Sequence, residues 1–178
     1  MPEIRADGVA IYVYRKLEGR LEFLQMQRVG HGDPYAHTWQ TVYGSVEKGE
    51  TAVQAAWREF REETGLTAIT MWQIEHLESF YFLEKDYVCV MPVFAVEVPA
   101  HARPVLDHEH EGYRWVPETQ LSTAFMWRSQ HQALAAVCEM IHNGSAAAKF
   151  LKGQGVERAI NVEGGTDEWE AAHLPIER

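Results

Sequence analysis

The distribution of apolar residues predicts strands in the first hundred residues of the chain. β-branched and aromatic residues gather in some segments and alternate with polar residues in others, and both patterns are typical of strands. The segments with these patterns are 7–16, 21–28, 68–84 and 87–98. Pro92 indicates an edge position or a bulge in the last of them, and a short later strand is predicted at 113–116.

Two further segments have the 3.6-residue period of amphipathic helices. The first runs from Thr51, a predicted N-cap, to Thr64, and Gly65 is a typical helix stop. The second is 127–141. Glycine and proline mark two intervening segments as loops, namely 29–37 and 99–112. This mixture of strands and helices predicts the α/β class.

The first helix has a predicted core face beside an acidic face. A stripe of four residues at helical spacing is assigned to the core: Val53, Trp57, Phe60 and Thr64. Glu59, Glu62 and Glu63 stand at positions i, i+3 and i+4, so their carboxylates share one side of the helix. Small residues lie along the same side one to two turns earlier and leave space for a loop or ligand: Ala52, Ala55 and Ala56.

Charge and cysteine content narrow the classes of function. The chain has 178 residues and a formal net charge of −10, which argues against sequence-independent binding to nucleic-acid phosphates. Cys89 and Cys138 are too few for a disulfide framework or a zinc cluster. No leader pattern or apolar run of membrane-spanning length is found. We therefore expect a cytoplasmic protein without a membrane or nucleic-acid partner.

The acidic helix face has two interpretations. It is either a solvated surface whose glutamates pair with Arg58 and Arg61, or a site for a hard divalent cation such as Mg²⁺, which binds carboxylate oxygens and substrate phosphates. Gly44, in the turn before the helix, permits a close approach of the backbone. Its carbonyl is a further candidate ligand.

The spacing of residues around this helix favours the metal interpretation. Gly44 is followed by five residues, Glu50, seven residues, the run REFREE (58–63), one residue and then Gly65-Leu66. This pattern resembles the Nudix box, GX5EX7REUXEEXGU, in which U is a bulky aliphatic residue. All the fixed positions of the box are present.

Two positions depart from the family pattern, and neither is a metal ligand. Phe60 occupies a U position, and Tyr43 stands where many members have proline. The order of the predicted elements follows the family over about residues 5–142. The resemblance implies a Nudix domain at 1–142, with an α/β/α sandwich and a mixed β-sheet. It also implies hydrolysis of a nucleoside diphosphate linked to another moiety, with Mg²⁺ or Mn²⁺ as cofactor.

The resemblance also implies roles for the residues of the box. Glu59 and Glu63 are implied to be principal metal ligands, and Glu62 a further ligand or near-metal carboxylate. Glu50 and Arg58 are implied to support the site. Arg58 is expected to project away from the metal face and to hold the loop against the helix through Glu50.

The segment before the last predicted strand is expected to add a metal ligand or catalytic group. DHEHEGYRWV (107–116) resembles the EHxxYxW pattern of bacterial pyrophosphohydrolases in the same family. This makes Glu109 the first candidate for a further metal ligand or general base, beside Glu62 and Glu63. The rival candidates, as a base or a phosphate contact, are Glu111, His108 and His110. A plain polar surface loop is the alternative.

Three residues outside the box are candidates for binding substrate. Arg28 ends the second strand and is suited to a bidentate grip on phosphate, the alternative being a surface charge. Tyr35 and Trp39 are suited to stacking on a base or pterin, the alternative being a place in the core.

The surrounding segment is similar to Nudix enzymes that release pyrophosphate from dNTPs or from dihydroneopterin triphosphate. The resemblance therefore favours a Mg²⁺-dependent pyrophosphohydrolase of a nucleoside-triphosphate-like or nucleoside-diphosphate-X substrate, with a nucleotide or pterin polyphosphate as partner. The alternatives are a non-catalytic nucleotide-binding regulatory module and a hydrolase of dinucleoside polyphosphates or nucleotide sugars.

The last part of the chain has a different character. Residues 143–178 are predicted to form a short C-terminal αβα appendage. Within it, FLKGQG, INVEGG and W…LP resemble the C-terminal end of a rhodanese domain. Ile141 stands where the catalytic cysteine of that family would align, which argues against sulfur transfer. We expect the appendage to pack on the Nudix domain or to support a homodimer.

Overall fold

The computed structural model describes residues 1–30 and 35–143. The chain divides into two compact units, Met1–Cys138 and Glu139–Arg178, and the fold below is that of the first. Of the appendage predicted at 143–178, only Asn143, the last residue of α3, is described, so the αβα structure and the domain boundary stay predictions. Within the described ranges, no helix is both long enough and apolar enough to cross a membrane.

A single mixed sheet contains the eight strands of the described residues. In chain order they are β1 (Glu3–Arg5), β2 (Gly8–Leu17), β3 (Arg20–Arg28), β4 (Trp39–Gln40), β5 (Val42–Ser45), β6 (Thr70–Phe82), β7 (Tyr87–Val98) and β8 (His110–Pro117). β7 runs parallel to β1 and β2 and antiparallel to β6. β2 is antiparallel to β3 and β5, and β3 is antiparallel to β4 and β8. The predicted mixed sheet is confirmed.

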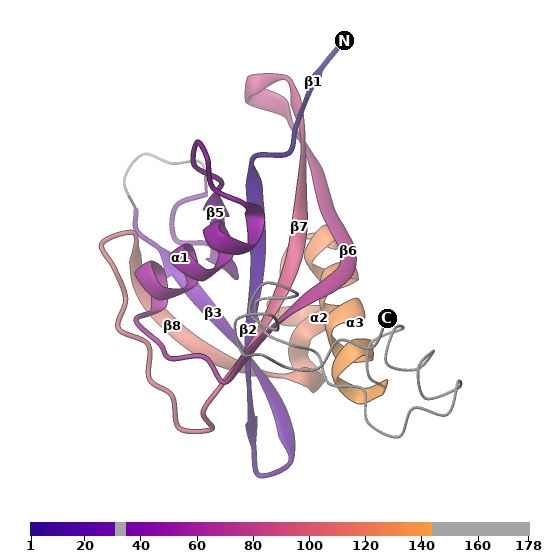
Figure 1. Cartoon of the computed structure of the whole chain (residues 1–178). Helices are drawn as coiled ribbons and strands as arrows, with labels where there is room; N and C mark the ends of the chain where they lie inside the picture. The colour runs from indigo at the N-terminus through magenta and orange to yellow at the C-terminus, as the bar shows by residue number, and fades with distance from the viewer. Residues whose placement is uncertain (31–34, 144–178) are drawn as a thin grey trace, which may run out of the picture. The chain divides into compact units, whose positions relative to one another are not determined.

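Helices cover both faces of this sheet (Figure 1). They are α1 (Ala52–Thr64), α2 (Leu121–Ala124) and α3 (Arg128–Asn143), with 3-10 turns η1 (Leu83–Lys85) and η2 (Glu118–Gln120). Because side chains alternate along a strand, Ile11 of β2 joins the apolar core with Phe60 of α1. Its neighbour Tyr12 points the other way and packs against Phe125, with ring centroids 6.3 Å apart. The arrangement confirms the α/β/α sandwich.

The ends of α1 follow from its sequence. The Thr51 hydroxyl accepts a hydrogen bond from the backbone N–H of Gln54, and the Gln54 side chain accepts one from the N–H of Thr51. This capping box satisfies backbone donors at the first turn. Gly65 adopts φ 61° and donates its N–H to the Arg61 carbonyl, a left-handed conformation that favours glycine. Both predicted ends are confirmed.

The faces of α1 differ in part from the prediction. Phe60 and Thr64 are fully buried as expected, but Val53 is 46% exposed. Ala55 and Ala56 are fully buried in the apolar core and do not flank the carboxylates as an open surface. Small side chains at these two positions let the helix pack closely on the sheet.

Two strand predictions also need correction. β7 pairs with β1 as far as Cys89 and with β2 from Val93 onward, so Pro92 lies in the interval between these two pairings. The predicted bulge is on β6 and not in β7: it lies between Ile74 and Leu77, where Leu77 faces Pro92. β8 begins at His110, earlier than predicted, because pairing with β3 continues to Arg28 opposite His110. The loop before β8 is therefore shorter, and His110 has a fixed place in the sheet.

Candidate active site

The turn between β5 and α1 lies directly against the acidic side of the helix. A Cβ atom at Gly44 would overlap Cγ of Glu59 and lie 2.7 Å from its Oε1. The backbone N–H of Ser45 donates to the same Oε1 at 3.0 Å. Glycine is thus required at position 44 because a carboxylate of α1 occupies the space of a side chain.

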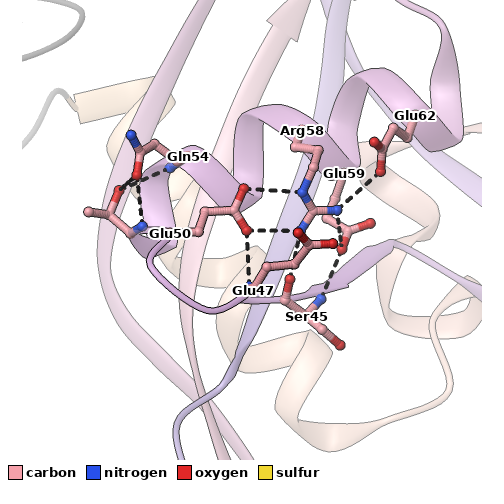
Figure 2. Close-up of polar contacts among 8 residues, drawn as sticks. Ser45, Glu47, Glu50, Gln54, Arg58, Glu59 and Glu62 are labelled. Atoms are coloured by element: carbon pink, nitrogen blue, oxygen red, sulfur yellow. Dashed lines mark hydrogen bonds and ion pairs between the residues drawn. The ribbon is translucent and has the colours of Figure 1, made fainter.

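Arg58 is the centre of the polar contacts around this turn (Figure 2). Its Nε and Nη2 donate to the two oxygens of Glu50 at 3.1 and 3.0 Å, and Nη2 also donates to the Ser45 carbonyl at 2.8 Å. The hydrogen bond from Arg58 lowers the pKa of Glu50 below its ordinary value. The Glu50–Arg58 pair thus joins the turn to the helix.

The expected orientation of Arg58 away from the acidic face is wrong. Its Nη1 lies 2.9 Å from Glu59 Oε1 and 3.1 Å from Glu62 Oε2. The long guanidinium-bearing side chain reaches Glu50 on the turn and both glutamates on the helix. In this structure Arg58 therefore neutralises part of the acidic face.

Glu63 is placed differently from Glu62. The Glu62 side chain is 59% exposed, whereas Glu63 is only 6% exposed and its Oε2 has no hydrogen-bond partner among the described residues. Burial raises the pKa of Glu63 to about 9, and the negative charges of Glu59, Asp107 and Glu109 act in the same direction. These four acidic residues come from two distant segments of the chain.

Asp107 and His110 approach Glu63 from the loop and the first residue of β8. Nδ1 of His110 lies 2.9 Å from Asp107 Oδ1. Its Nε2 lies 3.7 Å from Glu63 Oε2, and both of these buried atoms lack a hydrogen-bond partner among the described residues. Because the His110 side chain is only 1% exposed, this histidine is poorly placed to contact a phosphate. Asp107 is a residue that sequence reasoning misses, since nothing in DHEHEG distinguishes it from its acidic neighbours.

Glu109 and Glu111, the two rival carboxylates, have different surroundings. The backbone of Glu109 is fixed by hydrogen bonds from Val29 N–H to its carbonyl (2.9 Å) and from its own N–H to Asp107 Oδ1 (3.0 Å). Glu111 is instead paired with Nδ1 of His37. The charge of Glu109 is among those that raise the pKa of Glu63. His108 is exposed.

Arg28 lies close to the buried glutamate. It stands opposite His110 in the β3–β8 ladder, and its positive charge lowers the pKa of Glu63 against the larger opposing effects. An arginine at this place is suited to a phosphate that approaches the carboxylates.

Tyr35 and Trp39 occupy separate environments and are both half-buried. The ring of Tyr35 meets Phe82 and Trp127 edge-on, each with centroids 6.1 Å apart. The guanidinium carbon of Arg114 lies over the ring of Trp39, at 4.3 Å from the ring centroid. Tyr35 therefore belongs to an aromatic group with Phe82 and Trp127, and Trp39 belongs to a cation–π pair.

The donor set fits a hard divalent cation, although its side chains are not gathered around one point. Across residues 1–30 and 35–143, no group of three His, Cys, Asp or Glu side chains is arranged to hold a metal ion. Glu59 and Glu62 turn toward Arg58, and Glu63 turns inward. A cation would neutralise the like charges that raise the pKa of Glu63. Oε2 of Glu63, which has no hydrogen-bond partner among the described residues, is a suitable oxygen ligand for it.

Comparisons with known proteins identify the family and the fold of this chain. The family model described as NUDIX domain matches residues 4–137. The asymmetrical bis(5'-nucleosyl)-tetraphosphatase of Caenorhabditis elegans is 31% identical over 114 residues, which are 63% of this chain and 78% of that protein. The dihydroneopterin triphosphate diphosphatase of Escherichia coli K12 is 30% identical over 142 residues, 73% of this chain and 90% of that protein. A Listeria monocytogenes structure titled as a NUDIX hydrolase superposes with a TM-score of 0.65 and 26% identity, covering 78% of this chain and 96% of that chain.

The sandwich fold and the glycine turn against a glutamate-rich helix are those of a Nudix domain. The chain belongs to the Nudix family. It is a hydrolase that acts on phosphoric anhydride bonds, in a family that generally uses a divalent metal such as Mg²⁺.

Proposed function

We propose that this protein is a Mg²⁺- or Mn²⁺-dependent pyrophosphohydrolase of a polyphosphate that carries a planar heterocycle. The observation that carries the proposal is buried Glu63, whose Oε2 has no partner among the described residues while three other acidic residues raise its pKa. Such a group is costly in the metal-free protein and becomes favourable beside a divalent cation. The cation supplies charge neutralisation for the phosphates and lowers the pKa of a bound water.

The ligands of this cation come from α1, its preceding turn and the loop before β8. They are the Gly44 carbonyl and the carboxylates of Glu59, Glu62, Glu63 and Glu109. Glu50 and Arg58 support them, because their ion pair and the Arg58–Ser45 hydrogen bond keep the turn against the helix. This pair fixes the position of the turn, while the carboxylates of Glu59 and Glu62, which are paired with Arg58 in this structure, reorient when the metal binds.

Three carboxylates are candidates for the general base: Glu62, Glu63 and Glu109. Glu62 is hydrogen-bonded to Arg58, and Glu63 is buried. Glu109 is exposed and its charge acts on Glu63, so it lies near the metal site and remains accessible to water. Glu109 therefore takes the proton of the attacking water.

Arg28 and Tyr35 have separate roles in binding the substrate in this proposal. Arg28 binds a phosphate beside Glu63. The ring moiety packs against Tyr35, whose neighbours Phe82 and Trp127 supply further aromatic surface. Trp39 has a weaker case as a ring contact, because Arg114 covers its face.

The names of two relatives support two chemical groups of substrate for this proposal. One relative bears the name of an enzyme for dihydroneopterin triphosphate, and the chain covers 90% of it. Another bears the name of an enzyme for bis(5'-nucleosyl) tetraphosphates, at 78% coverage. We propose a triphosphate of a pterin or a deoxynucleoside as substrate, and a dinucleoside polyphosphate as the second candidate.

A substrate panel tests the proposal directly. Wild-type protein is assayed for phosphate and pyrophosphate release from dihydroneopterin triphosphate, dNTPs, diadenosine tetraphosphate and nucleotide sugars, with Mg²⁺ and with EDTA. We expect Mg²⁺-dependent turnover of one group and loss of turnover in EDTA. Tight nucleotide binding in calorimetry without cleavage would instead support a non-catalytic regulatory domain.

A further inference from the structure

A second buried carboxylate lies on the opposite face of the sheet from Glu63. Glu78 of β6 is 1% exposed. Its Oε2 accepts a hydrogen bond from the Tyr12 hydroxyl at 2.7 Å, and its Oε1 accepts from the Tyr43 hydroxyl at 2.7 Å and from Ser129 Oγ at 3.1 Å. These three donors are neutral hydroxyl groups. They compensate a charge whose burial without hydrogen bonds is costly.

The Tyr43 hydroxyl is held from two sides. It donates to Glu78 and accepts a hydrogen bond from Nε2 of Gln130 at 3.1 Å. Gln130 is fully buried, and its Oε1 accepts from the backbone N–H of Trp127 at 3.2 Å. One hydroxyl thus connects β5 both to β6 and to the first turn of α3.

The backbone of β5 joins this network to the proposed metal site. Tyr43 directly precedes Gly44, which has no space for a side chain beside Glu59. The next residue, Ser45, donates its N–H to Glu59 and accepts from Arg58. Since side chains alternate along β5, Tyr43 is anchored on the α3 side while the Cα of Gly44 faces Glu59 of α1. The backbone of Ser45, at the end of the strand, also contacts α1.

We propose that Glu78 is a positioning residue for the metal site, because it fixes Tyr43 and through β5 the Gly44–Ser45 backbone against Glu59. The proposal rests on the proposed function, in which Gly44 and Glu59 are metal ligands. Loss of the Tyr43 hydroxyl leaves the fold and all ligands in place but loosens the strand that presents them. Metal affinity then falls by about tenfold, the lower end of the range for groups that orient ligands.

The test compares Tyr43→Phe with Tyr14→Phe. Tyr14 is a matched control, since its buried ring lies on β2 and its hydroxyl donates to a carboxylate, Glu97 Oε2, at 3.0 Å. Both variants lose one tyrosine–carboxylate hydrogen bond. Mn²⁺ binding to the full chain is measured by calorimetry, together with Tm in EDTA and kcat and KM. We expect weaker Mn²⁺ binding in Tyr43→Phe alone. Tm should fall in both variants, and further in Tyr43→Phe, which also loses the hydrogen bond from buried Gln130.

Each result separates the two proposals. Equal Mn²⁺ affinity in Tyr43→Phe and Tyr14→Phe overturns the positioning role and leaves the network a stabilising feature only. Wild-type protein that binds no Mn²⁺ overturns the metal site itself, and the positioning role with it. If Tyr43→Phe does not fold, Glu78→Gln decides, because it keeps the shape of the side chain and replaces the carboxylate that accepts from Tyr43. Unchanged Mn²⁺ affinity in Glu78→Gln then refutes the role, and weaker affinity supports it.

Discussion

Glu63 and Glu78 are both buried carboxylates, yet their surroundings differ in kind. Glu78 receives three hydrogen bonds from hydroxyl groups on three separate elements. Glu63 has an oxygen without a partner among the described residues, and the nearby charges of Glu59, Asp107 and Glu109 oppose its ionisation. Burial alone therefore does not identify a functional carboxylate. The difference lies in whether the protein itself supplies the compensating donors.

The buried carboxylates on the two faces of the sheet therefore have different roles. The hydroxyl groups around Glu78 make a closed network that is complete without a ligand. The acidic residues around Glu63 make an incomplete one that a cation completes. Glutamine is the informative replacement at both sites, because it keeps the shape of the side chain and removes its charge.

The largest difference between variants of Glu63 and Glu78 is expected in kcat. Glu63→Gln should lower kcat by about 10²–10⁴-fold, because it removes a charged ligand at the centre of the site. Glu78→Gln should lower kcat by about tenfold, through the looser β5 backbone. Steady-state assays with the best substrate of the panel measure both.

The same two variants should differ in stability with opposite signs. In EDTA at pH 8, Glu78→Gln should lower Tm, since an amide replaces the acceptor of three hydroxyl groups. Glu63→Gln should raise Tm, because folded Glu63 must hold a proton at this pH that the unfolded chain releases, whereas the neutral amide needs none. Full turnover in Glu63→Gln would refute the assignment of this residue to the site.

The second prediction concerns the contact between the turn and the helix. Gly44→Ala should weaken Mn²⁺ binding by about 10–100-fold, because the new methyl group displaces Glu59 from its present position. Gly112→Ala is the control, since its Cβ would have an ordinary contact of 3.5 Å with Gln27 Oε1. Calorimetric titration with Mn²⁺ measures both. Equal affinity in the two variants would show that the close approach at Gly44 has no part in metal binding.

The residues of the box could be predicted from sequence because they are close together in the chain. Their spacing fixes the length of the turn and the register of one helix, and Thr51 and Gly65 specify its ends by local capping chemistry. The Glu50–Arg58 contact is likewise local. The predicted orientation of the Arg58 side chain was wrong. This side chain is long and flexible and reaches Glu59 and Glu62, and helical periodicity does not specify such a conformation.

Contacts between residues far apart in the chain could not be predicted from the sequence. Asp107 and His110 reach Glu63 only because β8 pairs with β3 as far as Arg28. The partners of Glu78 come from β2, β5 and α3, and none of these residues has a pattern that separates it from ordinary core or surface positions. Their roles follow from the sheet order, which one sequence does not specify.

The third prediction is a pH dependence of stability in the metal-free protein. Glu63 has a folded pKa of about 9 against an ordinary value of 4.5. Between these values the folded protein holds a proton that the unfolded chain releases, so stability falls as pH rises through this window. Each pH unit costs about 1.4 kcal/mol of stability, so in EDTA Tm should decrease by roughly 3–6 °C per pH unit between pH 6 and 8.

The Glu63→Gln variant isolates this contribution from those of the other titrating groups. The difference in Tm between variant and wild type should grow with pH in EDTA and shrink when Mg²⁺ is added, because the cation favours the ionised carboxylate. A constant difference across pH 6–8 would contradict the high pKa of Glu63.

The smallest expected effect compares two ion pairs of similar exposure. Glu50–Arg58 has side chains 16% and 25% exposed, and Glu22–Arg15 has 19% and 15%. Glu50→Gln and Glu22→Gln should each cost about 1 kcal/mol or less of stability. Only Glu50→Gln should also weaken Mn²⁺ binding, by a few-fold, because Arg58 then holds the Ser45 carbonyl and Glu59 less firmly. Thermal melting measures the stability of both variants, and Mn²⁺ titration measures their metal affinity. Equal Mn²⁺ affinities would show that the Glu50–Arg58 pair stabilises the fold without influence on the metal site.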